Sequence, residues 1–169
     1  HIALNQLAKE FNFKLDVVGI SEIDKYAIQS YNAIHGETKN YGSICDIKEI
    51  PLVDIFTYSF PCQDISLAGN QKGFSRDSGT RSGLLWEVER ILEQQEKIDK
   101  LPKVLLMENV KALAGIKFKD DFIEWQLKLQ SLGYTNYWEI LNAKDYGIPQ
   151  NRERVFMVSI LGKYSFNFP

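Results

Sequence analysis

Apolar segments that are continuous rather than alternating recur along this chain, with helical segments between several of them. Residues 53–60 read VDIFTYSF and residues 102–110 read PKVLLMENV, and residues 82–98 between them carry leucine, valine and isoleucine at helical spacing. A strand that is apolar at consecutive positions is typical of a sheet covered on both faces by helices. The sequence therefore predicts an α/β fold with a doubly wound, mostly parallel sheet.

The other segments continue this order of helices and strands. Helices are expected at residues 1–11, 24–36 and 118–133, and strands at residues 14–22, 134–143 and 154–161, with a short strand within 41–47. Because residue 1 already falls in an expected helix, we expect the sheet to lack its first strand. The 169 residues suffice for one domain, and we expect it to be incomplete at both ends.

Composition excludes several classes of protein. Its two cysteines, Cys45 and Cys62, give neither a disulfide framework nor the spacing of a metal site. No signal peptide is recognisable and no apolar run is long enough to span a membrane. The net charge of −2 gives no indication of a nucleic-acid partner, although the segment after Cys62 is locally basic. We therefore expect no metal, no membrane contact and a cytoplasmic location.

Polar and reactive side chains follow the expected strands, at the edge where open α/β sheets bind ligands. Cys62 comes directly after a strand and Pro61, and a polar, glycine-rich segment follows it. Most free cysteines are small buried apolar residues, whereas a nucleophile needs thiolate character and access to substrate. The position of Cys62 favours a nucleophile, and Cys45, beside Asp46, is interpreted as structural.

Four further charged residues are candidates for a ligand site. Glu108 ends an apolar strand, so it is either a cap for the next element or an acid that donates to a ligand. Arg152 and Arg154 are two positions apart, so in an extended segment both can face one acceptor or form a solvated cluster. Glu22 lies where nucleotide-binding sheets place an acid for ribose hydroxyls, without the usual glycine-rich fingerprint. These residues alone leave the alternatives open.

Taken together, several segments resemble the cytosine-C5 DNA methyltransferase family. FPCQDIS at 60–66 is similar to its Pro-Cys nucleophile motif, MENV at 107–110 to its Glu-Asn-Val motif, and QNRERVF at 150–156 to its Gln-x-Arg-x-Arg motif. GNQKGF at 69–74 and LNAKDYGIPQ at 141–150 are further segments similar to the family, and all these segments occur in the family's order. The resemblance covers nearly the whole chain and implies the Rossmann-like fold of S-adenosylmethionine-dependent methyltransferases.

The resemblance also implies a reaction. Cys62 would add to C6 of a cytosine flipped out of duplex DNA, and C5 would then take a methyl group from S-adenosylmethionine. Glu108 would supply a proton or strong hydrogen bond at N3 of the ring. Arg154 would hold the ring O2, and Arg152 would help to fix the thiolate and a nearby phosphate.

Binding residues are assigned by the same resemblance. Those expected at the cofactor are Glu22, Ile23, Asp46, Ile47, Pro61 and Leu84. Those expected at DNA are Gln63, Ser66, Lys72, Arg76 and Arg81, in a segment whose glycines would allow it to close over the flipped base.

The chain also departs from the family pattern. The family's first strand and Phe-x-Gly-x-Gly loop are not found, and its target-recognition domain is expected beyond residue 169. We expect a monomeric bacterial enzyme as a whole, acting in a restriction-modification system, with this chain inactive alone. The alternatives are a related transfer-RNA methyltransferase and a non-catalytic fragment that retains only the fold.

Overall fold

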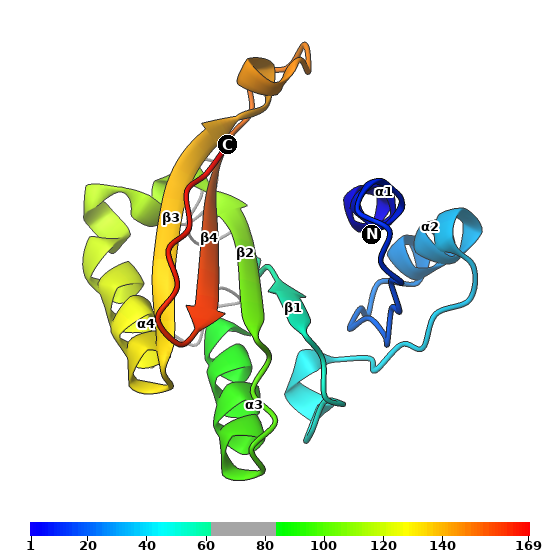
Figure 1. The fold of residues 1–169 in the computed structure, drawn as a ribbon, viewed down its shortest axis with the longest axis horizontal. Coiled ribbons are helices and arrows are strands. Elements are labelled where there is room, and N and C mark those ends of the chain that lie inside the picture. Colours follow the sequence, from blue (N-terminus) through cyan, green and yellow to red (C-terminus); the bar gives the residue numbers. More distant parts are fainter. Residues whose placement is uncertain (62–83) are drawn as a thin grey trace. The chain divides into compact units, whose positions relative to one another are not determined.

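The computed structural model describes residues 1–61 and 84–169. These residues form two compact units, His1–Pro51 and Leu52–Pro169 (Figure 1). In the described part of the chain, no helix is long and apolar enough to cross a membrane. All strands that the structure describes belong to the second unit.

The N-terminal unit carries two helices. α1 (Ile2–Glu10) and α2 (Lys25–His35) confirm the helices expected there. α2 begins after Asp24, whose carboxylate accepts two backbone N–H bonds from the first turn, and it ends at Gly36, where φ is +80°. Both boundaries therefore follow from local sequence, because a capping carboxylate and a glycine with positive φ favour them.

The strands expected at residues 14–22 and 41–47 do not form in the described N-terminal unit. Ile20 and Asn40 make one isolated parallel bridge, in which the backbone N–H of Tyr41 donates to the Ile20 carbonyl at 2.8 Å. A short apolar segment becomes a strand only when neighbouring strands pair with its backbone along its length. The prediction of two strands here was wrong because apolar content alone does not supply those partners.

The C-terminal unit contains a sheet of four strands in the order β1-β2-β4-β3 (Figure 1). These strands are β1 (Ile55–Tyr58), β2 (Val104–Val110), β3 (Tyr134–Asn142) and β4 (Glu153–Leu161). β1 and β2 run parallel, whereas β4 runs antiparallel to both β2 and β3. The predicted α/β class is confirmed, and the described sheet is mixed.

The direction of β4 follows from the connection that precedes it. Residues 143–152 join β3 to β4 and contain only a short 3-10 helix, η5 (Ala143–Tyr146). A parallel return needs a crossover of about a dozen residues or more, so this connection produces an antiparallel pair. The continuous apolar sequence of β4 reflects its place inside the sheet, where Val155, Met157 and Val158 are buried.

Two helices, α3 (Leu85–Lys97) and α4 (Lys119–Ser131), pack against one face of this sheet. Trp125 of α4 is fully buried, and its ring lies edge-on to Trp86 of α3, with centroids 6.1 Å apart. Its Nε1–H donates to the Tyr58 hydroxyl of β1 at 2.9 Å. Burial raises the pKa of Tyr58, so the phenol stays neutral and accepts this bond.

β2 therefore has two different faces. Leu105, Met107 and Asn109 are buried, and Met107 is aligned with Tyr58, so this set faces the helices. Glu108 alternates with them and lies on the other face, where it is only half-buried. The alternation of the strand thus removes Glu108 from the helix-covered core and places it on the face of the sheet away from α3 and α4.

Candidate active site

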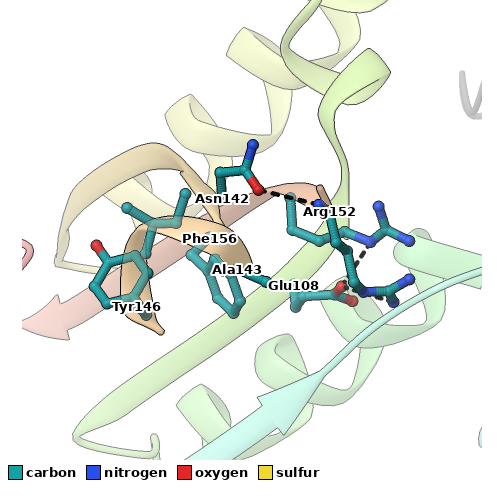
Figure 2. Close-up of a pocket in the computed structure, with 8 residues that line it drawn as sticks. Glu108, Asn142, Ala143, Tyr146, Arg152 and Phe156 are labelled. Atoms are coloured by element: carbon teal, nitrogen blue, oxygen red, sulfur yellow. Dashed lines mark hydrogen bonds and ion pairs between the residues drawn. The ribbon is translucent and has the colours of Figure 1, made fainter. Parts of the chain in front are cut away.

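Glu108 and two arginines meet on the face of the sheet away from α3 and α4. Arg154 Nε lies 3.1 Å from Glu108 Oε1, and Arg152 Nη2 lies 4.0 Å from the same oxygen (Figure 2). Of the two arrangements that the sequence leaves open for these arginines, the structure shows the one in which both face one acceptor. Because one carboxylate faces two guanidinium groups, the cluster has a surplus positive charge that can attract an anion.

The pairing of β2 with β4 produces this meeting. Val110 is aligned with Arg154, so Arg154 lies diagonally across from Glu108. Glu153, between the two arginines in sequence, is held by Lys111, whose Nζ lies 2.8 and 3.0 Å from the two carboxylate oxygens. This ion pair joins the residue after β2 to the first residue of β4, beside the cluster.

A pocket of about 320 Å³ opens beside the cluster. It is lined by Glu108, Leu141, Asn142, Ala143, Tyr146, Arg152, Arg154 and Phe156, most of which Figure 2 labels. Its charged groups come from β2, from β4 and from the residue directly before β4, whereas its apolar and aromatic walls come from β3, η5 and β4. The volume is at the lower end of the range of small-molecule sites, roughly 300–1,000 Å³.

Asn109 connects this site to the end of β1. The side chain is buried, and its Nδ2 donates to the backbone carbonyl of Phe60 at 3.1 Å, while its Oδ1 accepts from Val110 N at 2.8 Å. Phe60 precedes Pro61, so the bond fixes the backbone that leads to Cys62. This role of Asn109 was not predicted from the sequence, although buried amides are nearly always hydrogen-bonded.

We expect Asn109→Ala to destabilise the protein by about 1–3 kcal/mol, because it removes both hydrogen bonds of a buried side chain, one to the Phe60 carbonyl and one from Val110 N–H. Urea unfolding of the whole protein measures the effect. Ser131→Ala is the control, since Ser131 donates to a backbone carbonyl at 2.7 Å in a position open to water. We expect the control to change stability by no more than about 0.5 kcal/mol. Equal losses in both variants would contradict the role given to Asn109.

The expected cofactor residues of the N-terminal unit lie in two turns. Glu22 Oε1 accepts backbone N–H bonds from Ile23 at 2.8 Å and from Asp24 at 2.9 Å, so this carboxylate shapes the entry to α2. The Ile23 side chain beside it is 76% exposed. Asp46 ends the 3-10 helix η1 (Ile44–Asp46), and Ile47 after it is buried.

The other expected site residues belong to the segment around β1 and α3. Pro61 follows β1 and Leu84 directly precedes α3, and both are half-buried. Outside the described residues lie Cys62, Gln63, Ser66, Lys72, Arg76 and Arg81. Their roles, like those of all these positions, stay predictions. Among residues 1–61 and 84–169, no group of three or more histidine, cysteine or acidic side chains could hold a metal ion.

Comparison with known proteins decides the family. Residues 2–169 match the sequence model of the family described as C-5 cytosine-specific DNA methylase. The chain belongs to this family. The resemblance inferred from the Pro-Cys, Glu-Asn-Val and Gln-x-Arg-x-Arg motifs is thus confirmed. The C-5 cytosine-specific DNA methylase match begins at the first helix and continues through β4.

Curated relatives support the same assignment. The chain is 52% identical over 165 residues to the type II methyltransferase M2.ScrFI of Lactococcus lactis subsp. cremoris, covering 95% of this chain and 43% of the relative. It is 53% identical over 139 residues to the orphan methyltransferase M.SssI of Spiroplasma monobiae, covering 79% of this chain and 36% of that protein. The chain thus spans less than half the length of these relatives.

A solved structure shows the fold. The Entamoeba histolytica methyltransferase EhMeth matches with a TM-score of 0.72 and 20% sequence identity, covering 94% of this chain and 48% of that one. At this identity the likeness concerns the fold alone. It confirms that this C-5 cytosine-specific DNA methylase chain has a methyltransferase fold.

Proposed function

We propose that the protein containing this chain transfers a methyl group from S-adenosylmethionine to C5 of cytosine in duplex DNA. The observation that carries the proposal is the convergence of Glu108, Arg152 and Arg154 beside a pocket, in a chain of the C-5 cytosine-specific DNA methylase family. An acid flanked by two cations suits a ring that gains electron density during reaction. The proposal includes an extruded base, because C6 is inaccessible inside a duplex.

The proposed chemistry begins at Cys62. Its thiolate forms a bond to C6, and the electron pair of the C5–C6 double bond moves into the ring, so that C5 becomes nucleophilic. Glu108 donates a proton or a strong hydrogen bond to N3, which offsets the charge that develops there. Arg154 holds O2, and Arg152 helps to fix the thiolate and a nearby phosphate. Once C5 has taken the methyl group, with S-adenosylhomocysteine as the other product, the C5 proton is lost to solvent and the electron pair of that C–H bond re-forms the C5–C6 double bond. Cys62 then leaves C6 as a thiolate, and the proton at N3 returns to Glu108.

S-Adenosylmethionine, when bound, supplies an electrophilic methyl group to C5. The N-terminal unit offers groups that suit the nucleoside part of S-adenosylmethionine. These are the Glu22 carboxylate and, next to it in the chain, the exposed Ile23 side chain. A carboxylate accepts bonds from ribose hydroxyls, and an apolar side chain packs against a base. Asp46 is proposed to accept from the adenine amino group and Ile47 to pack on its ring, with Pro61 and Leu84 in further contact.

The proposal also concerns the rest of the protein. This chain spans 43% of one relative and 36% of another, so we propose that it is the catalytic part of a longer enzyme. Further segments would then hold the methionine end of the cofactor and read the DNA sequence. The names of type II relatives favour a bacterial restriction-modification setting, and the proposal includes a monomeric, cytoplasmic enzyme.

The test uses the protein expressed from its whole reading frame with tritiated S-adenosylmethionine. Mixed-sequence duplex DNA and transfer RNA are offered in separate reactions, and the labelled nucleosides are separated after digestion. We expect the tritium label in 5-methyldeoxycytidine from the duplex DNA. Label in transfer RNA alone would favour the related RNA methyltransferases, and label in neither would favour a fragment that retains only the fold.

A further inference from the structure

The β3–β4 ladder changes its hydrogen-bond pattern where it reaches the pocket. Asn142 and Glu153 are the last aligned pair of the two strands. One step further, Ala143 N still donates to the Arg152 carbonyl at 3.1 Å. The carbonyl of Ala143 is turned into the η5 turn, where it accepts from Ile148 N at 3.2 Å. The Arg152 N–H therefore needs another acceptor than its usual ladder partner.

The Asn142 side chain is that acceptor. Arg152 N donates to Asn142 Oδ1 at 3.0 Å, a bond drawn in Figure 2. The same oxygen accepts from Lys144 N at 3.3 Å and so caps η5, while Asn142 Nδ2 donates to Asn151 Oδ1 at 2.7 Å. One amide side chain thus holds both ends of the segment that joins β3 to β4.

The hydrogen bond to Asn142 has a larger effect on the position of Arg152 than on that of Arg154. Arg154 lies inside β4 and is aligned with residues of both neighbouring strands. Arg152 precedes β4, its side chain is 48% exposed, and its nearest contact with Glu108 is 4.0 Å. The short hydrogen bonds that the structure shows for Arg152 are those of its backbone, so a shift of this backbone would carry the guanidinium group with it.

We propose that Asn142 is a positioning residue for the methyl transfer reaction: it fixes the backbone of Arg152 and thereby the distance of that guanidinium group from Glu108. The inference rests on the proposed function where it concerns turnover. The competing explanation is a cap that only stabilises the hairpin, as side chains at this position before a helix commonly do. A cap alone lowers stability without a selective loss in kcat.

Two substitutions separate these explanations in the protein expressed from its whole reading frame. Asn142→Ala removes all three hydrogen bonds of the side chain. We expect kcat to fall roughly tenfold to a hundredfold, because small displacements at reacting groups have effects of this size. We expect KM for S-adenosylmethionine to stay within about threefold of wild type. Asn142→Asp keeps a carboxylate oxygen for both N–H groups, and the Asn151 amide can turn its nitrogen toward it. We expect it to recover most of the lost turnover.

Asn136→Ala is the matched control. Asn136 lies on the same strand, and its Nδ2 donates to the Gln126 carbonyl at 2.9 Å, away from the cluster of Glu108 and the two arginines. We expect this variant to lose thermal stability about as much as Asn142→Ala while keeping kcat within about twofold. A fall in kcat no larger in Asn142→Ala than in the control would overturn the proposal.

Amide hydrogen exchange gives a readout that does not depend on activity. We expect the Arg152 amide to exchange at least about tenfold faster in Asn142→Ala than in the wild type, with little change in Asn142→Asp. Unchanged exchange at Arg152 in Asn142→Ala would overturn the inference even if methyl transfer is seen. Failure of the wild type to methylate any substrate would instead overturn the proposed function, and the exchange result would still decide how Arg152 is held.

Discussion

Replacing Cys62 by serine should reduce methyl transfer by at least about a thousandfold, because a hydroxyl is a far weaker nucleophile than a thiolate at neutral pH. The wild-type protein should also form a covalent adduct with duplex DNA that carries 5-fluorocytosine at target positions. Fluorine cannot leave C5 as a proton does, so the bond between the cysteine sulfur and C6 persists. Denaturing gels with wild type and Cys62→Ser measure the adduct directly.

Cys45→Ser is the control for this experiment. Cys45 is exposed and lies in η1, where its backbone N–H donates to the Ser43 hydroxyl. Substitution of its side chain leaves that bond intact, so turnover and adduct yield should stay within about twofold of wild type. An adduct of equal yield in Cys62→Ser would remove Cys62 from the mechanism. Loss of the adduct in Cys45→Ser would instead indicate that Cys45 is the nucleophile.

The helices and the strands of the C-terminal unit could be predicted because their signals are local. The apolar face of residues 82–98 and the continuous apolar runs of β2 and β4 are visible in a few consecutive residues. The direction of β4 could not be predicted in the same way. An apolar run indicates burial on both faces, which a central antiparallel strand shows as well as a parallel one.

The candidate site was predictable to the extent that its contacts follow from strand geometry. Alternation along an extended segment is enough to place Arg152 and Arg154 on one side. Their meeting with Glu108 depends on which strands are neighbours, and the motifs of a known family supplied that information. The partners of Asn109 and Asn142 were not predictable, because a side-chain amide bonds to whichever backbone groups the tertiary fold leaves unpaired.

Glu108→Gln should lower kcat about a hundredfold or more, with DNA affinity within about threefold of wild type. Glutamine keeps the size of the side chain, and its carbonyl oxygen can still accept from Arg154 Nε, which lies 3.1 Å from Glu108 Oε1. What it loses is the ability to give a proton to N3 and the negative charge between two guanidinium groups. Losses of this size are typical of general acids and of electrostatic stabilisation in active sites.

Glu153→Gln is the control for Glu108→Gln. Glu153 lies between the two arginines in sequence, but its carboxylate pairs with Lys111 at 2.8 Å instead of joining their cluster. The two substitutions change the net charge equally and lie on neighbouring strands, so a general electrostatic effect on DNA binding should be similar in both. We expect Glu153→Gln to keep kcat within about threefold, since exposed ion pairs contribute little. Single-turnover methylation with enzyme in excess over DNA measures the rate constant of the chemical step, to which product release does not contribute. Similar rate constants for the two variants would reject the role of Glu108 at the ring.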